Sequence, residues 1–198
     1  TTAPERILER AIEVIDADGE VAIRVWGIAQ ECGVTGPILY RAFGSREGLI
    51  IAAQTERYRR SLAIGSDFGY GQLTSSTTSE QFLENGILLF KFASDPARSH
   101  QRAVRASVLG SAISRPQLLE AIVAMENEVY SELARAIEWG KERGWVPADL
   151  DAKAFCALYI GAITSRLHVE LPGSIIDGDA WDRITMSALT HVGFIAAD

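Results

Sequence analysis

IAQECGVTGPILYRAFGSREGLI, residues 28–50, is the stretch that decides the fold. An apolar helical stripe runs up to Gly33, a residue that readily adopts the positive φ at which helices end. Thr35 occupies an N-cap position, and a short apolar face follows it at Ile38, Leu39 and Phe43. Ser45 then opens a further helix. Two short helices joined by a glycine-containing turn predict a helix-turn-helix, whose second helix can lie in the major groove of DNA.

The same stretch resembles the tetracycline-repressor (TetR) family of bacterial regulators. The resemblance is carried, in the family's order and at its spacing, by Ile28-Ala29, Gly33-Val34-Thr35, Leu39-Tyr40, Phe43, Ser45-Arg46-Glu47 and Leu49-Ile50. It covers about the first 55 of 198 residues. The resemblance implies a homodimer that binds double-stranded, palindromic operator DNA, and a small-molecule effector that binds the C-terminal domain.

The resemblance also implies which residues contact DNA. Thr35, Gly36 and Pro37 are expected to face base edges or a thymine methyl group. Tyr40 and Arg46 are expected to contact phosphates. Arg41 lies one helical turn beyond Pro37. Gly36 and Pro37 offer few hydrogen-bond donors, so base recognition would rely on methyl contacts, Arg41 and DNA shape. The alternative is that Tyr40 only packs the N-terminal domain and that Arg41 is solvated.

Arg24 departs from the family, which usually has Thr at the start of the second helix. A cation there opposes the helix dipole, and a nearby phosphate would offset that cost. The predicted DNA-binding set is therefore Arg24, Thr35, Gly36, Pro37, Tyr40, Arg41 and Arg46.

Charge is unevenly distributed along the chain. The net charge is −7, although residues 24–60 contain six Arg and three Glu, a local balance of +3. This local excess permits DNA binding with strong salt sensitivity. The hydrophobic content of 47% suffices for a substantial core, and no apolar run approaches 18 residues, so we expect a cytoplasmic protein without a membrane partner. Cys32 and Cys156 lie far apart in apolar helical patterns and are expected to be reduced.

The periodicity predicts an all-α fold of about nine helices. An N-terminal three-helix helix-turn-helix headpiece, residues 4–18, 25–32 and 35–42, is followed by a long helix at 45–63. Residues 65–79 are rich in Gly, Ser and Thr and predict a linker or loop. Further helical patterns cover 79–94, 96–112, 116–143, 151–170 and 179–196. We expect a DNA-binding domain at 1–50 and a helical ligand-binding and dimerisation domain at 51–198.

The C-terminal half offers candidates for an effector site and for a dimer interface. Phe90, Met125, Tyr130, Trp139 and Tyr159 are candidate ligand contacts for a mostly apolar effector, and are equally the residues of an ordinary core. Arg98, Arg102 and Arg105 share one helix face, for which a solvated surface is favoured over an anion site. A small-residue seam at Ala154, Ala157, Gly161 and Ser165, with Ile184, Ala188, Val192 and Ile195, predicts a four-helix dimer interface.

No spacing supports a catalytic, metal or cofactor site. His100, His168 and His191 are isolated, and there is no phosphate loop or paired-cysteine motif, so we expect neither an enzyme nor a cofactor. The leading hypothesis is a ligand-responsive transcriptional regulator, a repressor released by its effector. The alternative is a helix-turn-helix-shaped binding or scaffold protein with weak or no DNA binding, which the acidic first helix and the sparse Gly36-Pro37 turn would favour.

Overall fold

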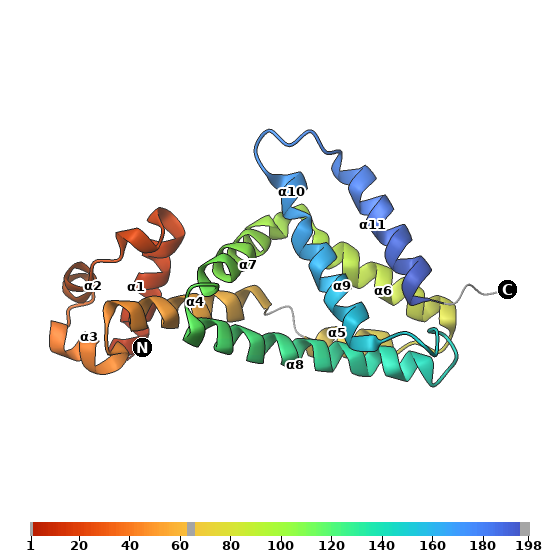
Figure 1. Ribbon diagram of the computed structural model, residues 1–198, viewed down its shortest axis with the longest axis horizontal. Coiled ribbons are helices and arrows are strands. Elements are labelled where there is room, and N and C mark those ends of the chain that lie inside the picture. Colours follow the sequence, from red (N-terminus) through yellow and green to blue (C-terminus); the bar gives the residue numbers. More distant parts are fainter. Residues whose placement is uncertain (1, 63–65, 195–198) are drawn as a thin grey trace. The chain divides into compact units, whose positions relative to one another are not determined.

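The computed structural model describes residues 2–62 and 66–194, and no strand occurs among them (Figure 1). The prediction of an all-α fold is confirmed. The helices are α1 (Ala3–Asp18), η1 (Glu20–Ala22), α2 (Val25–Glu31), α3 (Gly36–Phe43), α4 (Arg46–Leu62), α5 (Ser66–Thr74), α6 (Ser79–Ser94), η2 (Pro96–Arg98), α7 (Ser99–Ala112), α8 (Pro116–Lys141), α9 (Ala152–Ser165), α10 (Leu167–Glu170) and α11 (Gly178–Gly193), with η marking 3₁₀ helices.

The chain forms two compact units. The first comprises residues 1–60 and 108–122, so that the hairpin between α7 and α8 belongs with the N-terminal helices. The second comprises residues 61–107 and 123–198. The boundary expected after residue 50 falls inside α4, because this helix continues without a break to Leu62.

The first unit is built around the apolar faces of α1 to α4. Thr2 begins α1 with a capping box: its hydroxyl accepts from the backbone N–H of Glu5, whose carboxylate accepts from the backbone N–H of Thr2. Ile7, Leu39 and Leu49 are fully buried in one cluster that α1, α3 and α4 share. This cluster fixes α3 against the long helices, which determines what α3 presents to solvent.

The predicted loop at 65–79 is wrong in part, because α5 occupies Ser66–Thr74. The Gly- and Ser-rich composition was misleading here, because tertiary packing can outweigh the low helix propensity of these residues. Leu73 is buried, and a Cβ on Gly69 would lie 3.2 Å from a methyl group of Leu133. The small residue therefore permits α5 to pack closely. A second difference is that the helix expected at 151–170 is divided into α9 and α10 at Arg166.

The second unit has a core rich in aromatic rings. Phe82 is fully buried, and its ring centroid lies 5.8–5.9 Å from those of Trp139, Trp145 and Phe194. Gly140 allows this arrangement, because a Cβ there would lie 2.9 Å from the Phe82 ring. Within the described ranges, no helix is long and apolar enough to cross a membrane.

Candidate DNA-binding face and ligand cavity

The turn between α2 and α3 has the geometry of a helix-turn-helix. Gly33 adopts φ 65°, and the backbone N–H of Val34 donates to the Ala29 carbonyl at 2.9 Å. Thr35 is the N-cap of α3 with extended backbone angles, as expected, but its hydroxyl makes no capping hydrogen bond. The exposed hydroxyl at the start of α3 is therefore available to an external partner.

Trp26 covers the start of α3, a contact that sequence analysis missed. Trp26 is 68% exposed, and its indole lies over Gly36, where a Cβ would be 2.5 Å from Cζ3 and 2.7 Å from Cη2. Gly36 is consequently buried, and the indole takes its place on the outer surface. The signal in the sequence was a Trp one residue into α2, followed ten residues later by a glycine at the start of α3.

The outward face of α3 carries Pro37, Ile38, Tyr40 and Arg41, all exposed. Tyr40 is 42% exposed and Ile38 is 39% exposed, whereas Leu39 is fully buried. Ile38, expected to share one apolar face with Leu39 and Phe43, is therefore partly turned towards solvent. The face combines apolar groups with one phenol and one guanidinium.

Arg24 and Arg46 both bind backbone carbonyls beside this face. Arg24 is the N-cap of α2 without a side-chain cap, and its Nη1 donates to the Val21 carbonyl at 2.5 Å. Arg46 donates from Nε to the Ile23 carbonyl at 3.0 Å and from Nη2 to the Glu20 carbonyl at 2.8 Å. These bonds hold both guanidinium groups in place while each group stays exposed.

Ion pairing divides the six arginines of residues 24–60 into two groups. Arg57 pairs with Asp16 at 2.6 Å, and Arg59 and Arg60 pair with Glu56 at 2.6 and 2.8 Å. The two pairs hold the pKa of Glu56 at about 2, mainly through the hydrogen bond from Arg59. Arg24, Arg41 and Arg46 form no ion pair with a described residue. The uncompensated cations of this segment therefore gather around α2, α3 and the start of α4.

A polar network joins the headpiece to the α7–α8 hairpin within the first unit. Arg115 donates from Nη2 to Glu20 at 2.7 Å and from Nε to Glu47 at 2.5 Å. Glu20 also accepts from Ser111 Oγ at 2.5 Å and from the Gln54 amide. Burial raises the pKa of Glu20, but these hydrogen bonds and the charge of Arg115 outweigh it, so the pKa lies below its ordinary value. The spacing of these residues in the sequence gave no sign of the network.

The second unit contains a partly open cavity of about 160 Å³ lined by the end of α4 and by α5, α6, η2, α7, α8, α9 and α11. Most of the wall is apolar, with Leu89, Leu133, Ile137, Phe155 and Met186 among its residues. Cys156 also contributes, and burial raises the pKa of its thiol to about 12. Neither cysteine forms a disulfide.

Of the five predicted ligand contacts, Tyr159 lines the cavity. Phe90 is buried behind it, with its ring edge-on to Tyr159 at 5.8 Å, and Met125 and Tyr130 are absent from the wall. Trp139 packs on Trp145 at 5.3 Å and lines a separate groove of the same unit. Their helical positions direct these four side chains elsewhere.

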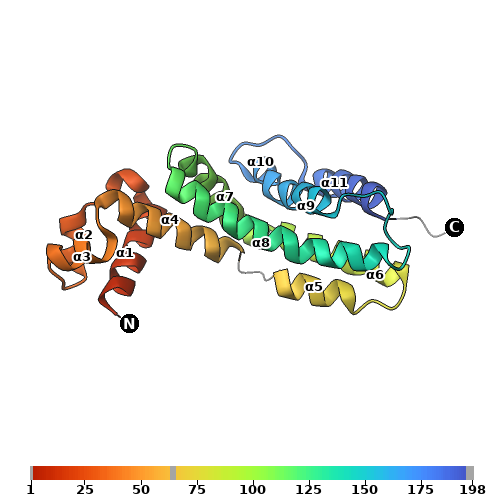
Figure 2. The ribbon, with the colours of Figure 1, turned by 60° about the horizontal axis from the view of Figure 1, so that its bottom comes forward.

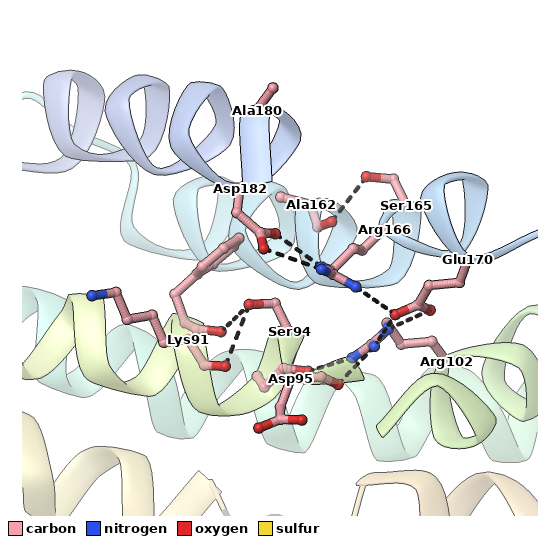
Figure 3. A network of polar contacts seen from close by, with 12 residues as sticks. Lys91, Ser94, Asp95, Arg102, Ala162, Ser165, Arg166, Glu170, Ala180 and Asp182 are labelled. Carbon is pink, nitrogen blue, oxygen red and sulfur yellow. Dashed lines mark hydrogen bonds and ion pairs between the residues drawn. The ribbon is translucent and has the colours of Figure 1, made fainter. Parts of the chain in front are cut away.

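The remaining wall is polar and comes from η2 and α7, which contribute Arg98, Gln101, Arg102 and Arg105. The expectation of a solvated arginine face is therefore wrong. Figure 3 shows that Arg102 is enclosed by its partners: it donates to Glu170 and to the Ala93 and Asp95 carbonyls, the latter two at 2.7 and 2.8 Å. Arg166 extends this network by donating to Glu170 at 2.7 Å and to Asp182 at 2.9 Å.

The small-residue seam lies exposed on α9 and α11, which run side by side (Figure 2). Ala154, Ala157, Gly161, Ser165 and Ala188 are exposed, and a Cβ on Gly161 would meet nothing within 4 Å. Leu158, Ile184 and Val192 are 53%, 71% and 43% exposed on the same helices. Ile195, the last residue of the expected seam, lies outside the described residues.

The first unit matches the sequence model of a known family. Residues 7–53 match the bacterial regulatory proteins of the tetR family, which confirms the resemblance. No curated protein matches the sequence. In the part of the chain that the structure describes, no group of three or more His, Cys, Asp or Glu could hold a metal ion.

Solved structures share the fold over nearly the whole chain. A TetR transcriptional regulator from Chloroflexus aurantiacus is 17% identical with a TM-score of 0.64, covering 98% of this chain and 97% of that one. A proposed TetR-family regulator from Mesorhizobium loti is 14% identical with a TM-score of 0.70, covering 98% and 97%. A proposed regulator from Saccharomonospora viridis, solved with choline, is 19% identical with a TM-score of 0.65, covering 98% of both chains.

Proposed function

Since this chain carries the N-terminal domain of the tetR family of bacterial regulatory proteins, we propose that it is a transcriptional repressor released by a small effector. A homodimer binds a palindromic operator through two copies of α3. Occupation of the cavity in the second unit then lowers the affinity for DNA. The observation that carries the DNA-binding part is the gathering of Arg24, Arg41 and Arg46, without carboxylate partners among the described residues, around an exposed recognition helix.

The residues around α3 divide into two roles. Arg24, Arg46 and Tyr40 bind phosphates. The guanidinium groups of Arg24 and Arg46 flank α3 and are held in place by backbone carbonyls, and Tyr40 offers a phenolic hydroxyl from α3 itself. Thr35, Pro37 and Arg41 contact base edges and thymine methyl groups from the exposed face of α3. Gly36 acts indirectly, since it provides the flat surface on which the Trp26 indole rests.

The dimer forms through α9 and α11. Their exposed small and branched residues allow two helices of each subunit to approach those of the partner closely, which favours a four-helix interface. Two recognition helices held in this way are expected to be about 34–36 Å apart, one turn of DNA.

The cavity is the effector site. Its volume of about 160 Å³ suits a small molecule, and the similar protein from Saccharomonospora viridis was solved with a small molecule, choline. Releasing the operator about 100-fold requires a coupling free energy of about 2.7 kcal/mol, within the usual allosteric range. By reciprocity, saturating operator DNA weakens effector binding by the same factor.

A binding titration over a range of salt concentrations tests the DNA-binding part. A duplex selected from a random-sequence library is titrated by fluorescence anisotropy between 50 and 200 mM KCl. The two proposed phosphate-binding arginines of each subunit, Arg24 and Arg46, give four such contacts per dimer, so the log–log salt slope is about −4 and affinity falls about 10²-fold. A protein that selects no duplex at 50 mM KCl would be the scaffold of the alternative hypothesis.

Two variants test whether the salt slope of DNA binding arises from the proposed DNA-binding face. Arg46→Ala removes two phosphate contacts per dimer and is expected to reduce the slope by about two. Arg59→Ala is the matched control, because Arg59 is an exposed headpiece arginine whose charge Glu56 compensates. Equal slopes for the two variants would remove Arg46 from the phosphate-binding residues.

A further inference from the structure

The polar wall of the cavity indicates the chemical class of the effector. We propose that it is a small amphipathic anion, with a compact apolar body of about six carbons and a carboxylate bound by Arg98 and Gln101. This inference rests on the proposed function, because it concerns the effector of the same cavity.

The apolar body follows from the size and lining of the cavity. Leu89, Leu133, Ile137, Phe155 and Ile163 line it, and its volume is about 160 Å³. A buried apolar cavity of about 150 Å³ is large enough to bind benzene. A chain or ring of about six carbons therefore fits, and a larger polar molecule would leave its hydrogen-bonding groups without partners.

The charge of the head group follows from the η2–α7 wall. The described residues of the lining include three arginines and neither Asp nor Glu. Arg102 is compensated by Glu170, and Arg105 is held by Thr164 Oγ1 and the Ser61 carbonyl, so the proposal does not depend on either charge. Arg98 stacks on the Phe92 ring at 3.9 Å and forms no ion pair with a described carboxylate. The positive charge of Arg98 in this wall disfavours binding of an ammonium group and favours a carboxylate, to which a guanidinium can donate two hydrogen bonds.

Gln101 supplies a second group that lacks an internal partner. Its Oε1 atom is buried without a hydrogen bond, which is costly for an amide beside an apolar cavity. Because Oε1 makes no hydrogen bond, the amide can rotate by a half-turn without losing one. This rotation exchanges Oε1 and Nε2 and leaves the shape of the side chain unchanged. Gln101 lies three residues after Arg98, so Nε2 can donate to the same carboxylate. Arg98, the last residue of η2, directly precedes α7, and Gln101 lies in the first turn of α7, where the helix dipole also favours negative charge.

Matched ligands test the head group apart from DNA release. Hexanoate, 1-hexanol and hexylammonium share one apolar body and differ in charge. Binding to the DNA-free protein is measured at pH 7 by isothermal titration calorimetry. Hexanoate is expected to bind at least about tenfold more tightly than 1-hexanol, because hydrogen bonds to a charged group are the stronger ones. Hexylammonium is expected to bind more weakly than both. Equal affinities for the three, or a preference for the ammonium, would overturn the proposal.

Two variants locate the carboxylate. Arg98→Gln is expected to reduce hexanoate affinity about tenfold and to leave 1-hexanol unchanged. Arg143→Gln is the control, because Arg143 also stacks on an aromatic ring, Trp139 at 3.6 Å, but does not line the cavity. A loss of hexanoate affinity in both variants, or in neither, would overturn the assignment to Arg98.

The effector hypothesis and the head-group proposal fail in different ways. Hexanoate that binds with the expected preference but does not release DNA refutes the effector role of the cavity and leaves the carboxylate site standing. DNA release by 1-hexanol and hexanoate at equal concentration supports the effector role and overturns the carboxylate site.

Discussion

Replacing Glu20 by Gln is expected to loosen the α7–α8 hairpin from the headpiece within the first unit. The substitution keeps the shape of the side chain and removes the charge that Arg115 neutralises at 2.7 Å. Glu20 and Arg115 are 24% and 19% exposed, between the surface and fully buried cases. Exposed pairs contribute about 0–1 kcal/mol, and breaking a buried pair costs about 3–5 kcal/mol. We therefore expect Glu20→Gln to cost about 2 kcal/mol.

Urea unfolding followed by circular dichroism measures this loss. With a slope of about 2 kcal/mol per molar urea, the midpoint falls by about 1 M. Glu13→Gln is the control, because Glu13 is 57% exposed in its pair with Arg10, and its midpoint is expected to stay unchanged. Arg115→Gln and the double variant complete a cycle whose coupling energy is expected to be about 1–2 kcal/mol. Additivity within about 0.5 kcal/mol would show that the two residues do not stabilise the unit together.

The pH dependence provides an independent check on Glu20. Its folded-state pKa lies below the ordinary value of 4.5. The contribution of the carboxylate is therefore fully present above about pH 4.5 and is lost as pH falls through the lowered pKa. Wild type is expected to lose more stability than Glu20→Gln between pH 5 and pH 3. Parallel curves for the two proteins would contradict the lowered pKa.

Three further predictions concern single residues. Gly36→Ala displaces the Trp26 indole, since the added Cβ would lie 2.5 Å from the ring, and anisotropy should show weaker DNA binding with unchanged circular dichroism. Gly27→Ala is the control, because its Cβ would lie 3.7 Å from the Cβ of Arg24, an ordinary van der Waals distance. Gly161→Leu has room in the subunit and should sediment as a folded monomer; a dimer would exclude this interface. Cys156, with a pKa of about 12, should resist iodoacetamide at pH 8 until urea unfolds the protein, and rapid native labelling would contradict its burial.

Local signals predicted most of the helices. The glycine turn at Gly33, the N-cap at Thr35 and the breaks before Pro116 and after residue 143 were predicted from residues adjacent in sequence. These boundaries agree with the structure within a few residues, since α8 ends at Lys141. The helix α5 could not be predicted in this way, because its Gly-rich sequence forms a helix through packing on Leu133, a residue far along the chain. Tertiary contacts outweighed propensity there.

Residue type was a poor guide to the cavity. Aromatic side chains fill cores and line cavities equally well, so Phe90, Tyr130 and Trp139 could not be separated from Tyr159 without the placement of the helices around them. Helical spacing did group Arg98, Arg102 and Arg105 on one face. Which side of α7 faces the cavity depends on the other helices that line the cavity.

Whether the charge of an arginine is compensated depends on carboxylates that lie far away in sequence. Arg57 is compensated by Asp16 across 41 residues, and Arg102 by Glu170 across 68 residues. A count of the six arginines in the segment 24–60 therefore overestimates the number of cations available to DNA. The fold leaves Arg41 without such a partner among the described residues, on the exposed face of α3. An acidic chain can thus present a basic surface, because folding pairs arginines with carboxylates elsewhere and leaves the cations beside the recognition helix uncompensated.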